Sequence, residues 1–310
     1  MKALIHKYIS SLAILGFIAL ITPPALLAAE PLNVVASFSI LGDMTKRIGG
    51  ERLQVHTLVG PDADAHVFQP TPADAKTLAQ ASLVVVNGFG FEGWINRLVK
   101  SSGYRGKVLI AGNGIKVLKP AHSHDEKHGK HDHESDADPH AWQDLSNALR
   151  YVDNIAQALG TADPSGKEIY LANAEKYKQE ISQVDDEIRK MFKDIPAERR
   201  KVVTSHDAFA YFSRAYGVTF VAPLGINTDA EASAGDIGKI IKQIRREKIP
   251  AVFMENISDP RLLERIRKES GARVGGTLYS DSLSASAGPA PTYLDMMRHN
   301  AKTLSEALTY

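Results

Sequence analysis

The 310-residue sequence contains no cysteine. This absence excludes disulfide bonds, and it also excludes thiolate ligands for a metal ion. Any bound metal must therefore be held by imidazole and oxygen donors. A lipid anchor on an N-terminal cysteine is excluded for the same reason, and this exclusion favours a freely soluble protein after export.

Excess charge and long apolar runs are also scarce. The formal net charge is +1, so there is no electrostatic case for nucleic acid or for a membrane surface. Residues 9–27 form an apolar stretch after a basic start, which predicts a secretory signal peptide over residues 1–29, cleaved near Ala29. A membrane anchor is the alternative, but Pro23 and Pro24 interrupt the run and it is short for a spanning helix. The expected location is the periplasm.

The mature chain, about 280 residues, exceeds the usual size of one domain and suggests two. Short β-branched runs alternate with helical patterns in both halves of the chain, which predicts βαβ units. The expected fold class is α/β, with two similar lobes built on mostly parallel sheets. The expected strands are 33–40, 54–59, 82–87 and 107–111 in the first lobe, and 201–205, 218–221, 251–255 and 273–278 in the second.

A stretch without proline, residues 165–194, has apolar positions at helical spacing. It predicts one long, rigid helix of about 40 Å that joins the lobes. The expected organisation is therefore a signal peptide at 1–29, an N-terminal lobe at 30–160, the linking helix at 165–194 and a C-terminal lobe at 195–310.

Within the first lobe, residues 122–138 have the sequence HSHDEKHGKHDHESDAD and cannot bury a core. This predicts an exposed loop with five histidines: His122, His124, His128, His131 and His133. Two interpretations stay open. The histidines make weak, exchangeable metal contacts ahead of a main site, or the loop is a solvated spacer.

Candidate ligands occur in segments that follow expected strands: His66 in DAHVFQP, His140 in DPHAW, His206 in VTSHDAF and Asp281 in LYSDSL. Each alone has an ordinary structural explanation, such as a core or loop histidine, or an aspartate in a turn or N-cap. Together they lie two to a lobe, at the strand-to-loop edge where open α/β sheets bind ligands. A cleft between the lobes could gather them. Three imidazoles and one carboxylate suit tetrahedral zinc and leave a charge of about +1.

The chain resembles the bacterial periplasmic zinc and manganese receptors, the cluster A-I substrate-binding proteins of ABC importers. The matching segments are GPDADAHVFQPTPAD, DPHAW, VTSHDAFAYF, LYSDSL and the helix-rich tail at 293–308. The resemblance implies two α/β lobes bridged by a long helix, with a metal ion in the cleft held by His66, His140, His206 and Asp281. It implies a transport receptor and not an enzyme. The expected partner is the permease of an ABC importer, a periplasmic metal chaperone is a further candidate, and the protein is expected to be a monomer.

The identity of the metal depends mainly on His206. Manganese-preferring receptors of this family commonly have glutamate at the corresponding position, whereas many zinc-type members have histidine. Imidazole also suits zinc, copper and nickel, while manganese favours oxygen donors. The expected cargo is therefore Zn(II), with Mn(II) as the alternative.

Other polar residues and other functions have weaker support. His56 and His299 fall in an expected strand and helix and are expected to be structural, while Asp207, Glu255 and Asp229 are candidates for orienting a ligand. A zinc hydrolase is a rival function, but the chain has no H-E-x-x-H pattern and four protein ligands would close the site to a substrate. A surface adhesin is a second rival, disfavoured because the chain lacks a lipid-accepting cysteine.

Overall fold

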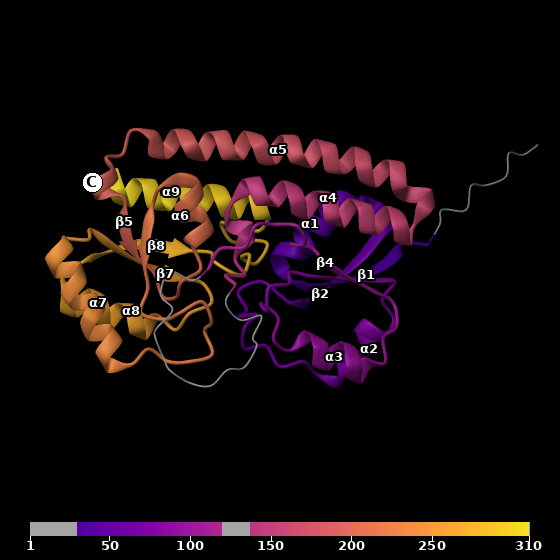
Figure 1. The fold of residues 1–310 in the computed structure, drawn as a ribbon, viewed down its shortest axis with the longest axis horizontal. Coiled ribbons are helices and arrows are strands. Elements are labelled where there is room, and N and C mark those ends of the chain that lie inside the picture. Colours follow the sequence, from indigo (N-terminus) through magenta and orange to yellow (C-terminus); the bar gives the residue numbers. More distant parts are fainter. Residues whose placement is uncertain (1–29, 120–136, 310) are drawn as a thin grey trace, which may run out of the picture. The chain divides into compact units, whose positions relative to one another are not determined.

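The computed structural model describes residues 30–119 and 137–309 (Figure 1). The expected signal peptide at 1–29 lies outside the described residues. So does the expected histidine-rich loop, apart from Ala137 and Asp138. Among the described residues, no helix is both long enough and apolar enough to cross a membrane.

The N-terminal lobe contains a four-stranded parallel sheet in the order β2-β1-β3-β4. Its strands are β1 (Leu32–Phe38), β2 (Leu53–Val59), β3 (Leu83–Val86) and β4 (Lys107–Ile110). The two central strands, β1 and β3, are almost entirely buried and read as continuous apolar runs, as expected for a parallel sheet covered on both faces. The helices of this lobe are α1 (Ser39–Gly49), α2 (Pro72–Ala79), α3 (Ile95–Ser102) and α4 (Leu145–Ala162).

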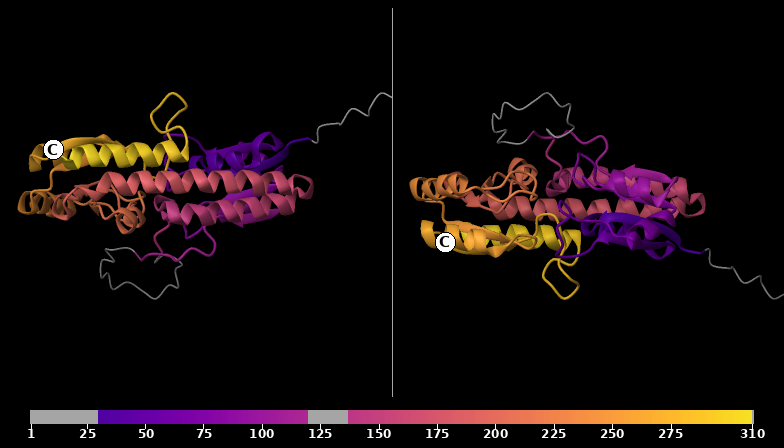
Figure 2. Two further views of the ribbon diagram at one scale, coloured as in Figure 1. Left: turned by 90° about the horizontal axis from the view of Figure 1, so that it is seen from above. Right: turned by 90° about the horizontal axis from the view of Figure 1, so that it is seen from below.

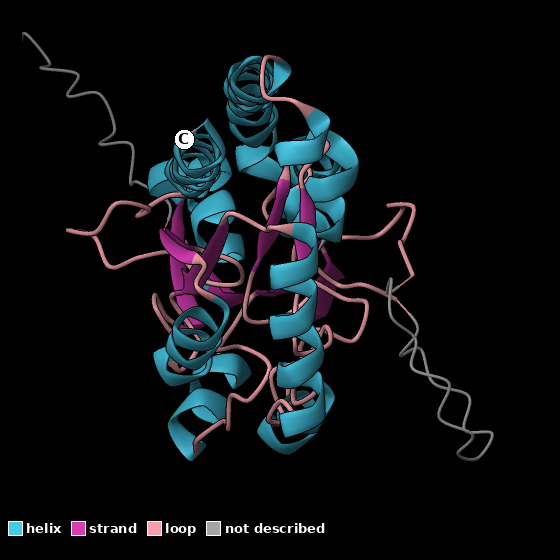
Figure 3. Ribbon diagram, turned by 90° about the vertical axis from the view of Figure 1, so that its left-hand side faces the viewer, coloured by secondary structure: helices cyan, strands magenta, loops and turns pink. Residues whose placement is uncertain are grey.

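The C-terminal lobe repeats this arrangement with the parallel order β6-β5-β7-β8. Its elements are β5 (Lys201–Val203), α6 (Ala210–Tyr216), β6 (Thr219–Val221), α7 (Ala234–Glu247), β7 (Ala251–Glu255), α8 (Pro260–Ser270), β8 (Arg273–Leu278) and α9 (Tyr293–Thr309). In both lobes the chain visits the strands in the same spatial order, so the expectation of two similar parallel lobes is confirmed. Helices lie on both sides of the strands (Figure 3).

Strand β5 is shorter than the expected 201–205. The strand ends at Val203, and only the N–H of Thr204 still donates to β6, to the carbonyl of Val221; the N–H groups of Ser205 and His206 donate to the carboxylate of Glu255 instead. A side-chain carboxylate thus takes the place of sheet pairing at the end of the strand. Short 3-10 helices occupy Gly50–Arg52, Ala141–Gln143, Pro164–Gly166 and Ala197–Arg199.

The long helix α5 (Lys167–Lys193) joins the lobes. It packs against α1 and α4 of the first lobe and against α6 and α9 of the second (Figures 1 and 2). Its buried positions recur every three or four residues, the spacing of one helix face: Tyr170, Ala174, Tyr177, Ile181, Val184, Ile188 and Phe192. At the margins of this face, the partly buried Glu180 pairs with Arg47 of α1 and the partly buried Glu187 pairs with Arg298 of α9. The helix therefore contacts both lobes along its length, and the rigidity of this connection stays a prediction.

The apolar core is continuous between the lobes. One buried cluster includes residues of both sheets and the inner face of α5, from Val34 to Leu308. A second, smaller cluster lies under α7 and α8 in the C-terminal lobe. Residues 31–310 accordingly form one compact unit of contacts. The division into separate domains at residues 160 and 195 stays a prediction.

Candidate metal centre

His66 lies in the loop that follows β2. Its backbone N–H donates to Oδ1 of Asp64 at 2.8 Å, and the indole N–H of Trp94 donates to the preceding carbonyl of Ala65 at 2.8 Å. The edge of the imidazole faces the ring of Phe91, with ring centres 4.7 Å apart. Two hydrogen bonds and an aromatic wall therefore fix the direction in which this histidine points.

His140 immediately precedes the 3-10 helix Ala141–Gln143 and is fully buried. Both its backbone N–H and its ring Nδ1 lie within hydrogen-bond distance of Oδ1 of Asp138, at 2.9 and 2.8 Å. The buried ring of Trp142 lies beside the imidazole, and the Nε1–H of Trp142 donates to the carbonyl of Ser280 in the C-terminal lobe. Asp138 thus leaves Nε2 as the nitrogen that faces the centre.

His206 follows β5 and is also fully buried. Its Nδ1 lies 2.7 Å from Oε2 of Glu255, at ion-pair distance although outside hydrogen-bond geometry. Oε1 of the same carboxyl accepts the backbone N–H groups of Ser205 and His206 at 2.7 and 3.0 Å. Glu255, at the end of β7, thereby holds both the backbone and the ring of His206.

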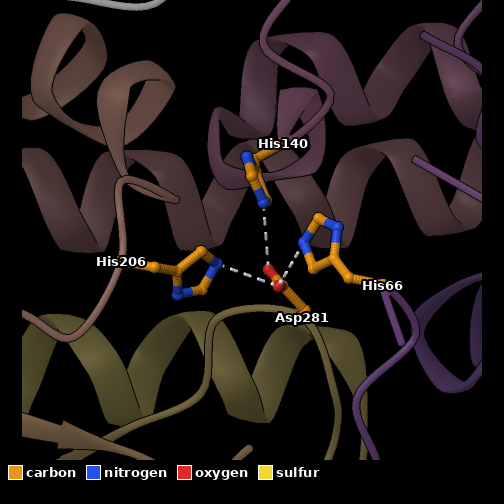
Figure 4. A group of neighbouring side chains, drawn as sticks. All are labelled: His66, His140, His206 and Asp281. Atoms are coloured by element: carbon orange, nitrogen blue, oxygen red, sulfur yellow. Dashed lines mark hydrogen bonds and ion pairs between the residues drawn. The ribbon is translucent and has the colours of Figure 1, made fainter. Parts of the chain in front are cut away.

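Asp281 follows β8 and lies between the three imidazoles (Figure 4). Its Oδ2 is 3.1 Å from Nε2 of His66 and 3.1 Å from Nε2 of His206. Its Oδ1 is 3.5 Å from Nε2 of His140. The candidate ligand atoms of the four residues all lie within 4.8 Å of one another. The structure therefore gathers the four residues singled out in the sequence, two from each lobe.

The donor set has the chemistry of a cation site. Nε2 of His140 and Oδ1 of Asp281 are buried, and neither has a hydrogen-bond partner within the described chain. Buried polar atoms are normally paired, because leaving one unpaired costs about 1–3 kcal/mol. A cation between the imidazoles and the carboxylate would satisfy both atoms at once.

Without a metal ion, the electrostatics of the site favour protonated imidazoles beside an ionised Asp281. Burial lowers the pKa of His140, but the charges of Asp281 and Asp138 outweigh it and raise that pKa to about 9. Burial likewise lowers the pKa of His206, while Glu255 and Asp281 raise it well above its usual value. Burial raises the pKa of Asp281, but the two imidazoles hold it well below its usual range. A divalent cation binding here would replace these protons.

Of the three residues expected to orient a ligand, one contacts an imidazole of the group. Glu255 does orient an imidazole, whereas Asp229 lines a cavity beside His66 and Asp207 donates its backbone N–H to the carbonyl of Gly225. His56 lies in β2 and His299 in α9, apart from the four-residue group. Sequence reasoning missed the role of Asp138. Its signal was the spacing Asp-x-His, which recurs as Asp64 and His66 and lets a carboxylate reach the backbone N–H two residues on.

Two parallel α/β lobes joined by a helix, with imidazoles and a carboxylate between them, define a metal-binding substrate receptor of the kind that serves a transporter. The comparisons with known proteins agree. The model of the family described as zinc-uptake complex component A, periplasmic, matches residues 34–307, and the chain belongs to this family. Members of this family are transport proteins, not enzymes.

Individual relatives cover nearly all of the chain. It is 34% identical over 281 residues to the manganese-binding lipoprotein MntA of Halalkalibacterium halodurans, a match that covers 90% of this chain and 89% of the relative. It is 32% identical over 287 residues to the manganese ABC transporter substrate-binding lipoprotein PsaA of Streptococcus pneumoniae, covering 91% and 90%.

A solved structure shares the fold. The periplasmic zinc-binding protein TroA of Treponema pallidum superimposes with a TM-score of 0.82 at 28% identity, over 90% of this chain and 99% of that one. The resemblance to metal receptors is thus confirmed. The chain therefore belongs to a family of metal-binding substrate receptors, among whose members PsaA is named for an ABC transporter.

Proposed function

We propose that the protein captures Zn(II) with His66, His140, His206 and Asp281 and delivers it to an ABC importer. The observation that carries this proposal is the composition of the buried group: three imidazoles face one carboxylate within 4.8 Å. Imidazole nitrogen suits zinc, and four protein ligands match its tetrahedral preference. Here the metal is cargo and not a resident cofactor.

The carboxyl groups behind the imidazoles support the same proposal. Asp138 approaches Nδ1 of His140 and Glu255 approaches Nδ1 of His206, so the Nε2 atoms face the cation. Such partners fix the ring orientation and increase the basicity of a metal-bound histidine. They also add negative charge close to the ion, which offsets the charge of about +1 expected from the four ligands alone.

Manganese is the second candidate, and the names of the relatives favour it. MntA and PsaA are both named for manganese, whereas TroA is named for zinc. Against manganese stands the preference of this ion for oxygen donors, since only one of the four candidate ligands here is a carboxylate.

Uptake measured in cells distinguishes the two candidates better than affinity does, because zinc binds nitrogen and oxygen sites more tightly than manganese in general. A strain lacking the gene is compared with the same strain carrying the wild-type gene or the His206→Ala variant. Radioactive zinc and manganese are supplied separately at low concentration. Zinc uptake should depend on the wild-type gene and fail with His206→Ala. If the wild-type gene restored manganese uptake but not zinc uptake, the cargo would be manganese and the zinc proposal would be wrong.

The ligand set is tested on the purified protein. After removal of metal by a chelator, the wild type should bind one zinc ion tightly, and alanine at any of the four positions should weaken binding by at least about tenfold. The matched control is His299→Ala, on α9. A ligand variant that bound zinc as tightly as the control would remove that residue from the set.

We also infer that the protein works in the periplasm, on the basis of the apolar stretch at residues 9–27 and the family description. Cell fractionation tests this. The mature protein should occur in the periplasmic fraction with an N-terminus near residue 30, and recovery of the full-length chain from the cytoplasm would contradict it.

A further inference from the structure

Of the four candidate ligands, His66 is the one whose side chain is not fully buried. Its side chain is 3% exposed, while those of His140, His206 and Asp281 are fully buried. His66 lines a cavity of about 1030 Å³ whose walls come mainly from the N-terminal lobe, including Phe68, Trp94 and Arg97. The cavity therefore leads from the surface to the His66 side of the site.

The C-terminal lobe contributes one residue to this cavity, Asp229. Asp229 belongs to the loop 222–233, which connects β6 to α7. A loop of the opposite lobe thus forms part of the wall beside His66. Its carboxylate would also attract an approaching cation.

A hydrogen bond between the lobes holds the same loop in place. The hydroxyl of Thr228 donates to Oδ2 of Asp64 at 2.6 Å, while Oδ1 of Asp64 accepts the backbone N–H of His66 at 2.8 Å. One carboxylate therefore connects the loop of the C-terminal lobe to the backbone of a candidate ligand in the N-terminal lobe.

The start of the loop 222–233 is hydrogen-bonded to the backbone on either side of His206. The backbone N–H of Leu224 donates to the carbonyl of Ser205 at 3.3 Å, and the N–H of Asp207 donates to the carbonyl of Gly225 at 3.0 Å. Ser205 and Asp207 are the two neighbours of His206 in the chain. The loop 222–233 therefore spans from the residues around His206 to the residue that positions His66.

We propose that the loop 222–233 is the gate through which the metal ion enters and leaves, and that Thr228 is a positioning residue that sets the rate of exchange. The proposal rests on the proposed function, because it takes the four-residue group as the metal site. Breaking the bond between Thr228 and Asp64 frees the loop at the cavity without removing a ligand. Both entry and release should then become faster.

The test compares zinc exchange in the wild type, Thr228→Val and Thr228→Ser, with Thr219→Val, at the exposed first position of β6, as the matched control. Zinc-loaded protein is mixed rapidly with excess chelator, and release is followed in time; association is followed with metal-free protein. A hydrogen bond to a charged group contributes enough that its loss should speed release about tenfold in Thr228→Val. Thr228→Ser, which keeps the hydroxyl, and Thr219→Val should release zinc at rates within about twofold of the wild type.

The outcomes separate this proposal from the proposed function. All variants should still bind one zinc ion, since no ligand is changed. If the wild type binds no zinc, the proposed function fails. If the wild type binds zinc but Thr228→Val exchanges it at the rate of Thr219→Val, the gate is overturned. If Thr228→Val does not fold, hydrogen exchange is measured on the wild type with and without zinc: the amides of residues 222–233 should be more protected with zinc, and equal protection would also overturn the gate.

Discussion

Nδ1 of His206 lies 2.7 Å from Oε2 of Glu255, while Nε2 of the same ring lies 3.1 Å from Oδ2 of Asp281. The imidazole is thus held between two carboxyl groups, one behind it and one in front. Oε1 of Glu255 accepts the two consecutive backbone N–H groups of Ser205 and His206. Glu255 therefore determines both where the chain turns after β5 and which ring nitrogen faces the site.

Replacing Glu255 by glutamine should separate these two tasks. The introduced amide would keep a carbonyl oxygen for the backbone N–H groups, but its NH₂ group cannot accept a proton from Nδ1. We expect Glu255→Gln to bind zinc about 10–100-fold more weakly while it stays folded. A competition titration against a chelating dye measures the change. Glu264→Gln, on the surface of α8, is the control; an equal affinity in the two variants would show that Glu255 has no influence on the metal.

The choice of metal should follow the donor at position 206. Glutamate at position 206 would replace an imidazole with an oxygen donor. This change should raise the affinity for manganese relative to the affinity for zinc. Oε2 of Glu255 lies 2.7 Å from Nδ1 of His206, so a glutamate at position 206 would be repelled by the carboxylate of Glu255. The double variant His206→Glu, Glu255→Gln avoids this conflict. Its ratio of manganese to zinc affinity, from competition titration, should rise at least about tenfold over that of Glu255→Gln alone, and an unchanged ratio would mean that position 206 does not select the metal.

The sequence was sufficient to predict the fold because its local patterns agree with its tertiary structure. Strands β3 and β7, one in each lobe, are short and mostly apolar, and α5 has one continuous apolar face without proline. Four polar residues at comparable strand ends then predicted a common site. The bounds of β5 differed because a side chain competes with the sheet: from Ser205 on, the carboxylate of Glu255 accepts the backbone N–H groups in place of a strand carbonyl.

Contacts between distant segments could not be predicted. Glu255 was recognised as a candidate partner, but nothing in the sequence pairs it with His206 across 49 residues. The bond between Thr228 and Asp64 joins residues 164 positions apart, and both are residue types common in ordinary loops. Such pairs depend on how the lobes meet, which no local pattern specifies.

Helix α5 should make the two lobes unfold together. Ile188 is fully buried on the helix face that packs on the continuous core, whereas Ile169 on the same helix is 45% exposed. We expect Ile188→Ala to lower the free energy of unfolding by about 2–5 kcal/mol, and Ile169→Ala to change it by less than about 0.5 kcal/mol. Urea unfolding of the metal-free protein measures both values. A single transition is expected by circular dichroism and by tryptophan fluorescence; two separate transitions would contradict a shared core.

Metal binding should release protons at neutral pH. In the metal-free protein the pKa of His140 is raised to about 9, from a usual value of 6.5, and the pKa of His206 is also raised. The His140 ring is therefore protonated at about pH 7.5 and must lose a proton before its Nε2 can bind a cation, and the raised pKa of His206 acts in the same direction. Zinc affinity should consequently rise with pH up to about 9.

The same shifts predict how stability depends on pH. The pKa of His140 is higher in the folded state than in the unfolded state, so protonation of this ring stabilises the fold. The stabilisation is fully present below pH 6.5 and is lost as the pH rises through about 9. Metal-free protein should therefore lose part of its stability between pH 6.5 and 9, while zinc-loaded protein should not, because its imidazoles stay unprotonated on the metal. Thermal unfolding with and without zinc across this range measures the difference.

Calorimetric titration at about pH 7.5, in two buffers with different heats of ionisation, counts the protons that zinc displaces. Asp138→Asn removes one of the charges that raise the pKa of His140, so this variant should release fewer protons than the wild type. Asp259→Asn, at the exposed N-cap of α8, should release the wild-type number. If the heat of binding is the same in both buffers, no proton is displaced, and the imidazoles face the site already neutral.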